Sequence, residues 1–93
     1  MGKKVKPSKM PEARFIDNAI TLGELIKAKR TAMGVKLSDC AALCGIGINT
    51  LSRIENGNQN CTLFAMFAVL NGLGIKLSAQ ELTSIASSTD EWV

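Results

Sequence analysis

The residues of this 93-residue chain that could bind a metal ion are three cysteines, Cys40, Cys44 and Cys61. Cys40 and Cys44 are four positions apart, so on a helix they would share one face and could offer two thiolates to zinc. A closed zinc site takes four ligands, and the chain has no histidine and only one further cysteine. We therefore expect no metal site, and we interpret the cysteines as small buried apolar residues.

Catalytic chemistry is not indicated either. The chain has no His and no Tyr, and its sequence pairs no nucleophile with a base. Ninety-three residues make at most one compact domain. We expect a protein that is not an enzyme and that uses no cofactor.

The 11 basic and 8 acidic residues give a net charge of +3, but they are unevenly distributed. Basic residues exceed acidic ones up to residue 77, whereas residues 78–93 carry only acidic charges. A basic surface suits a polyanion such as nucleic acid, although scattered lysines also serve ordinary solubility. Because there is no leader-like segment and no apolar run of about 20 residues, we expect a cytoplasmic protein with reduced thiols and no membrane contact.

Four short helices are predicted between residues 21 and 74. The first should start after Thr21 as its N-cap, the second and third should cover about 36–44 and 48–56, and the fourth should follow Thr62 as its N-cap. Gly and Asn residues mark the turns between them. Few residues are aromatic, so the core should be aliphatic and alanine-rich, which favours packed helices over a sheet.

The segment after residue 74 allows two interpretations. Ile75 and Leu77 alternate as in a strand, whereas Ser78 followed by Glu81 looks like a capping box that would start a fifth helix. Residues 84–93 are polar and short of bulky side chains, and we expect them to be disordered until a partner binds.

The most specific pattern lies in residues 35–57, VKLSDCAALCGIGINTLSRIENG. A small residue, Ala41, precedes a turn glycine, Gly45, which is followed by the apolar Ile46 and, further on, Leu51. This arrangement resembles the Cro/C1-type (xenobiotic-response-element-like) helix-turn-helix family. In that family the small residue lets two helices cross closely, and the two apolar residues pack around the recognition helix. Over residues 21–77 the resemblance implies an all-α, lambda-repressor-like DNA-binding domain of four to five helices.

The polar face of the predicted third helix is the candidate for reading DNA. A helix about 10 to 12 Å across fits the major groove if its exposed face is polar or small. Arg can hydrogen bond guanine and Asn can hydrogen bond adenine through two atoms each, and an apolar side chain can meet a thymine methyl. The alternative is an ordinary solvated helix face. We predict base contacts by Ile48, Asn49, Thr50, Ser52 and Arg53.

The resemblance also implies an ion pair. Arg30 stands where the family places an arginine that pairs with the glutamate of a Glu-x-Gly motif, which is Glu55 in this chain. Such a pair would brace the recognition helix and leave guanidinium edges for phosphate, whereas a surface pair would contribute at most about 1 kcal/mol. Contacts to phosphate set the register without reading sequence. The predicted phosphate contacts are Lys29, Arg30, Lys36, Ser38, Asn56 and Asn58.

Two positions depart from the family pattern. Many members have Gln at the start of the second helix, where it touches the DNA backbone, but this chain has Leu37. Either Leu37 packs inward or the contact is lost. The usual capping residue is replaced by Lys36, which leaves Ser38 as a late substitute.

Within the family the chain is similar to HipB-like antitoxins of type II toxin–antitoxin systems, which have a basic N-terminal segment, one helix-turn-helix domain, a dimerising strand and a tail ending near a Trp. The similarity implies a homodimeric repressor that binds a pseudo-palindromic operator in double-stranded DNA, represses its own operon and neutralises a HipA-like serine/threonine kinase toxin. Trp92 is then the candidate partner-binding residue. Two alternatives remain: a phage-type or restriction-modification controller repressor, and a protein-interaction module that has lost DNA binding, which Leu37 would favour.

The expected organisation has three parts. Residues 1–20 form a basic, mobile N-terminal arm, residues 21–77 form the helix-turn-helix domain, and residues 78–93 form a dimerisation and tail segment whose end is disordered. Such modules usually bind as dimers, and a strand after the fourth helix could pair across the two-fold axis.

Overall fold

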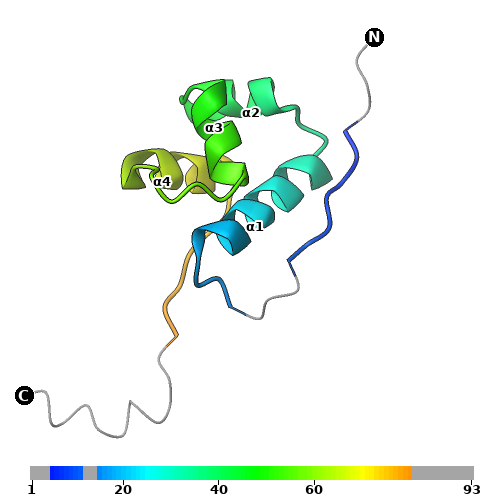
Figure 1. The fold of residues 1–93 in the computed structure, drawn as a ribbon. Helices are drawn as coiled ribbons and strands as arrows, with labels where there is room; N and C mark the ends of the chain where they lie inside the picture. The colour runs from blue at the N-terminus through cyan, green and yellow to red at the C-terminus, as the bar shows by residue number, and fades with distance from the viewer. Residues whose placement is uncertain (1–4, 12–14, 81–93) are drawn as a thin grey trace, which may run out of the picture.

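The computed structural model describes residues 5–11 and 15–80. It contains four helices, α1 (Ala19–Ala32), α2 (Leu37–Cys44), α3 (Ile48–Glu55) and α4 (Leu63–Gly72) (Figure 1). No strand is present in the described part of the chain, so the all-α prediction is confirmed. None of the described helices is long and apolar enough to cross a membrane.

The first helix begins earlier than the sequence suggested. Its N-cap is Asn18, whose side-chain Oδ1 accepts a hydrogen bond of 2.8 Å from the backbone N–H of Thr21. The prediction of Thr21 as the cap is therefore wrong, because Asn and Thr are both capping residues and only the backbone conformation at Asn18 decides between them. The predicted cap of α4 is confirmed: the Thr62 hydroxyl accepts a hydrogen bond of 3.1 Å from the N–H of Ala65.

The two central helices start without a side-chain cap. Lys36 precedes α2 and Gly47 precedes α3, and neither makes a capping hydrogen bond through its side chain. Ser38 is not the N-cap, because α2 already begins at Leu37 and Ser38 lies within its first turn. Between the two helices Gly45 adopts φ +72°, a left-handed conformation that suits glycine and makes the tight turn.

The core lies where all four helices meet, and it is aliphatic as predicted. On α3, Leu51 and Ile54 point inward and are fully buried, so the opposite face of this helix is turned to solvent. Leu37 packs against the core from the start of α2, which settles the first of the two departures in favour of inward packing. The buried core cluster comprises Ile26, Cys40, Ala41, Leu51, Ile54, Ala65, Val69, Leu70 and Leu73.

Helices α1 and α3 pack in direct contact at Gly23. A Cβ atom on Gly23 would lie 2.8 Å from the carbonyl oxygen of Glu55, and closer still to that of Ile54. Both oxygens belong to the backbone and cannot move aside as a side chain could. The packing of α3 on α1 therefore depends on the missing side chain of Gly23.

Residues 75–80 are neither strand nor helix in the single chain. Ile75 is half-buried against the core, and Leu77 is exposed. The capping box that would start a fifth helix needs Glu81, which lies outside the described residues.

Candidate DNA-binding interface

The outward face of α3 carries the residues predicted to read bases. Asn49 and Arg53 are exposed, and the side chain of Ile48 is 45% exposed although it is apolar. Thr50 and Ser52 are half-buried at the two edges of this face. Because Leu51 and Ile54 fill the opposite side, Ile48, Asn49 and Arg53 are the most accessible members of the predicted set.

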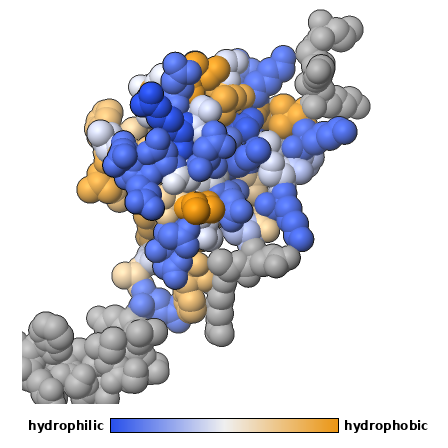
Figure 2. Space-filling model, in the orientation of Figure 1, coloured by the Kyte–Doolittle hydropathy of each residue, from blue (hydrophilic) through white to orange (hydrophobic). Residues whose placement is uncertain are grey.

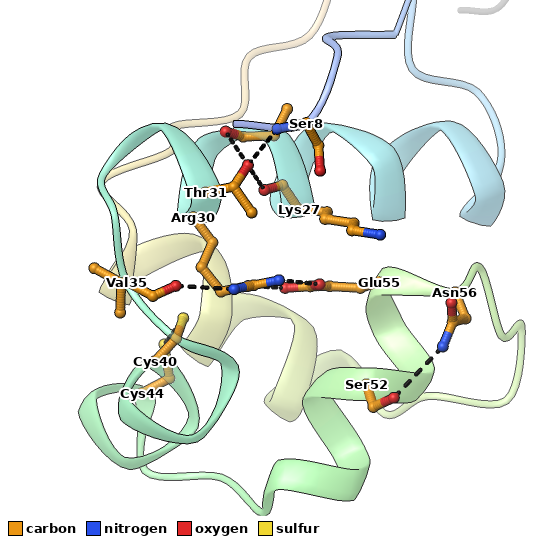
Figure 3. Close-up of polar contacts among 11 residues, drawn as sticks. Ser8, Lys27, Arg30, Thr31, Val35, Cys40, Cys44, Ser52, Glu55 and Asn56 are labelled. Carbon is orange, nitrogen blue, oxygen red and sulfur yellow. Dashed lines mark hydrogen bonds and ion pairs between the residues drawn. The ribbon is translucent and has the colours of Figure 1, made fainter. Parts of the chain in front are cut away.

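The two half-buried residues contact neighbouring groups. Ser52 Oγ accepts a hydrogen bond of 3.4 Å from Asn56 Nδ2, one turn later (Figure 3). Thr50 and Arg53 line a shallow surface hollow together with Asn60, a residue that the sequence analysis did not select. Only the fold could reveal Asn60, because the turn after α3 brings it back against that helix.

A bidentate ion pair fixes the C-terminal end of α3. Arg30 Nε donates to Glu55 Oε2 at 2.6 Å, and Arg30 Nη2 donates to Glu55 Oε1 at 2.9 Å (Figure 3). The third nitrogen, Nη1, donates to the carbonyl oxygen of Val35 at 2.8 Å. The pair therefore joins α1, α3 and the loop that leads into α2.

This ion pair is buried, unlike the surface pair that the sequence also allowed. The side chains of Arg30 and Glu55 are only 9% and 6% exposed. The hydrogen bonds to Glu55 raise the pKa of Arg30, against the opposing effect of burial. All three guanidinium nitrogens are engaged within the chain, so Arg30 acts as a bracing residue and little of it can meet phosphate. The exposed Lys29 beside it is the better phosphate candidate.

The remaining phosphate candidates are exposed before and after the two central helices. Lys36 and Ser38 are exposed at the start of α2, and Asn56 and Asn58 are exposed directly after α3. Asn58 also shapes its loop, since its Oδ1 accepts a hydrogen bond of 2.7 Å from the N–H of Asn60. As α2 has no side-chain cap, the N–H groups of its first turn are available to a phosphate oxygen.

The cysteine pair lies beside this framework. Cys40 is fully buried, Cys44 is half-buried, and their sulfurs are 4.0 Å apart. Burial, and next the neighbouring Cys44, raise the pKa of the Cys40 thiol to about 11, so the thiol is neutral at physiological pH. The described residues contain no group of three or more His, Cys, Asp or Glu side chains that could hold a metal ion.

Hydrophilic side chains dominate the face of the molecule shown in Figure 2, with apolar side chains scattered among them and a group of apolar side chains at its left edge. The left edge lies over α4, whose exposed apolar residues are Leu63, Phe64 and Phe67. The predicted partner-binding residue Trp92 lies outside the described residues.

Known proteins match the chain at the level of family and fold. The helix-turn-helix family model matches residues 26–80, which is more than half of the chain. A chain of the structure described as "Structure of HipA-HipB-O2-O3 complex" is 27% identical with a TM-score of 0.69, and the match covers 76% of this chain and 100% of that one. The "HipB-O4 20mer complex" gives the same values. A HipB chain from a structure described as an O1-O2 complex is 28% identical with a TM-score of 0.68, over 74% of this chain and 100% of that one.

No curated protein matches the chain in sequence. The family match nevertheless covers all of α2, α3 and α4, the helices that hold the candidate base-reading face and its supports. The chain therefore belongs to the DNA-binding helix-turn-helix family, of the Cro/C1 (XRE-like) type, and it is similar to HipB.

Proposed function

We propose that the protein is a sequence-specific transcriptional repressor that reads its operator with α3. The observation that carries this proposal is the orientation of α3: its inner face is held by Leu51, Ile54 and the buried pair of Glu55 with Arg30, while its outer face is open. Asn49 and Arg53 would contact base edges, because their side chains match adenine and guanine in the major groove.

Phosphate contacts would set the register of this reading helix. Lys29 and Lys36 are exposed at the end of α1 and the start of α2, and Asn56 and Asn58 are exposed directly after α3. Each phosphate contact should add salt dependence to binding without adding sequence preference.

We also propose that the repressor is a homodimer on a pseudo-palindromic operator. Two copies reading half-sites about 34 to 36 Å apart require an interface away from α3. A suitable surface lies at α4 and the segment after it, where Phe67 and Leu77 are exposed and line a shallow hollow with Ile75. Burial of these apolar side chains against a second copy would stabilise the dimer.

The finer proposal is an antitoxin that represses its own operon and binds a HipA-like serine/threonine kinase. It is supported by the match to a chain from a complex described as containing HipA and HipB. We propose that Trp92, on the acidic tail, anchors this partner, because an aromatic side chain brings a large apolar area at low entropic cost. A chain ending at Ala86 should hold DNA normally and bind the kinase less tightly, and full kinase affinity of that chain would contradict the proposal.

The direct test is selection of binding sites from a random duplex pool, followed by titration of the selected duplex and a scrambled one at several salt concentrations. A repressor should select a two-fold symmetric site and bind it far more tightly than the scrambled duplex. A protein-interaction module that has lost DNA binding would bind neither duplex at any of the salt concentrations. A phage-type or restriction-modification controller would select a site but would not bind a HipA-like kinase.

A further inference from the structure

Helix α1 is buried on two opposite sides, and only one of them faces the core. Ile26 and Arg30 point toward the other helices, in keeping with their burial and with the pair to Glu55. Ala28 is 1% exposed, yet it does not belong to the hydrophobic core cluster, and Thr31, one turn later, is only 5% exposed. Ala28 follows Ile26 by two positions, which places it on the opposite side of the helix. Another segment of the chain must therefore cover this side of α1.

Residues 5–11, which we call the N-terminal segment, supply a cover. The backbone N–H of Ser8 donates a hydrogen bond of 2.7 Å to Thr31 Oγ1, and this hydroxyl donates to the carbonyl oxygen of Lys27 at 2.8 Å (Figure 3). Figure 3 shows Ser8 and Glu55 on opposite sides of α1. The N-terminal segment is thus docked on α1, on the side away from α3.

The direction of the N-terminal segment follows from a second set of neighbours. Met10 and Pro11 line a shallow hollow with Glu24, about two helical turns before Thr31. Since Ser8 lies at Thr31 and Pro11 lies near Glu24, the segment runs antiparallel to α1, as Figure 1 shows. Residues 5–7 therefore continue toward the C-terminal end of α1.

That end of α1 already carries positive charge. Lys29 lies in the last turn of α1, and Lys36 follows it at the end of the loop that leads into α2. Lys6 stands two residues before Ser8, which is bonded to Thr31, so the docked segment brings Lys6 to this end of α1, and Lys3 and Lys4 precede it in the sequence. Lys6, Lys29 and Lys36 are exposed, and none of them forms an ion pair within the described residues. Gathering like charges is unfavourable unless an anion neutralises them.

We infer that the N-terminal segment is a second DNA-contacting element, in which Lys6 binds a backbone phosphate beyond the phosphates contacted at Lys29 and Lys36. The inference rests on the proposed function. Because the segment lies on the opposite side of α1 from α3, Lys6 does not reach the bases read by Asn49 and Arg53. Its contribution is therefore electrostatic and the same for every duplex sequence.

The first test is the salt dependence of duplex binding by Lys6→Ala in the full-length protein. Each neutralised phosphate contributes about 0.9 to the slope of log K against log salt concentration. Lys6→Ala should make that negative slope shallower by about 1 per protomer, on selected and scrambled duplexes alike, with no change in base preference. Lys6→Arg keeps the charge and should keep the wild-type slope.

A second pair of variants tests whether docking positions the lysine. Ser8→Pro removes the backbone N–H that bonds Thr31, whereas Ser8→Ala retains it. Ser8→Pro should reproduce part of the loss seen in Lys6→Ala, and Ser8→Ala should behave as the wild type. Thermal melts of all four variants check that the helices remain folded.

The outcomes separate this inference from the function on which it rests. An unchanged slope for Lys6→Ala, in a protein that still prefers its selected site, overturns the inference and leaves the repressor proposal standing. Equal binding by Ser8→Pro and Ser8→Ala overturns the role of docking. Absence of duplex binding by the wild-type protein overturns both proposals.

Discussion

Arg30 on α1 binds Glu55, the last residue of α3, through two parallel hydrogen bonds of 2.6 and 2.9 Å, and both side chains are buried. The same guanidinium holds Val35 at the entrance to α2. One side chain therefore fixes three elements relative to one another, and the angle of the recognition helix depends on it.

Arg30→Met should lower the free energy of unfolding by about 3 to 5 kcal/mol, because it leaves the carboxylate of Glu55 buried without a partner. The double variant Arg30→Met with Glu55→Leu should recover much of that loss, since no unpaired charge remains. Urea denaturation of the two single variants and the double variant measures the coupling between the two residues. Strictly additive losses would show that the pair does not act as a unit.

Gly23→Ala should destabilise the protein by about 1 to 3 kcal/mol, because the new methyl group meets backbone oxygens of α3 that cannot give way. Gly47→Ala is the comparison: the nearest atom to its added Cβ is Thr50 Oγ1 at 3.7 Å, so it should lose only the preference for Gly over Ala at the N-cap of α3, about 0.5 to 1 kcal/mol. Thermal unfolding of both variants compares them. Equal melting temperatures would mean that α1 and α3 can separate at little cost.

Because the thiol of Cys40 is buried, we expect the free energy of unfolding to fall at high pH. Its thiol has a pKa of about 11 in the folded protein, against an ordinary value of 9.0. A raised pKa stabilises the fold below pH 9, and this contribution is lost as pH rises from 9 to about 11. The stability advantage of the wild type over Cys40→Ala should therefore shrink across this range, as measured by urea denaturation at about pH 8, 9, 10 and 11. A constant difference would contradict a buried neutral thiol.

Features governed by local chemistry could be predicted from the sequence. The Thr62 cap depends on a hydroxyl three residues before an amide, and Gly45 is needed where the chain adopts a left-handed turn. The burial of Leu51 and Ile54 follows from their spacing on one face of a helix. These features place the four helices and the open face of α3.

Features that depend on distant parts of the chain could not be predicted in the same way. Gly23 and Glu55 are far apart in the sequence, and Ser8 and Thr31 are 23 positions apart. Neither contact can therefore be recognised from the spacing of residues along one helix. Asn18 and Thr21 are both capping residues, and local preference could not choose between them. The burial of Arg30 likewise follows from packing, and it shows why this residue is a weaker phosphate candidate than Lys29.

The central claim, that the outer face of α3 reads bases, is tested most directly by Asn49→Ala and Arg53→Ala on the selected operator and on operators altered at one base pair per half-site. Each variant should lose about 1 to 3 kcal/mol of binding free energy on the intact operator and should become indifferent to one base pair. Lys29→Ala serves as the comparison. Loss of a phosphate contact should weaken binding to all duplexes equally and make the salt dependence shallower by about 1. If Asn49→Ala and Arg53→Ala instead weaken binding to every duplex equally, with base preference intact, α3 does not read the operator through these residues.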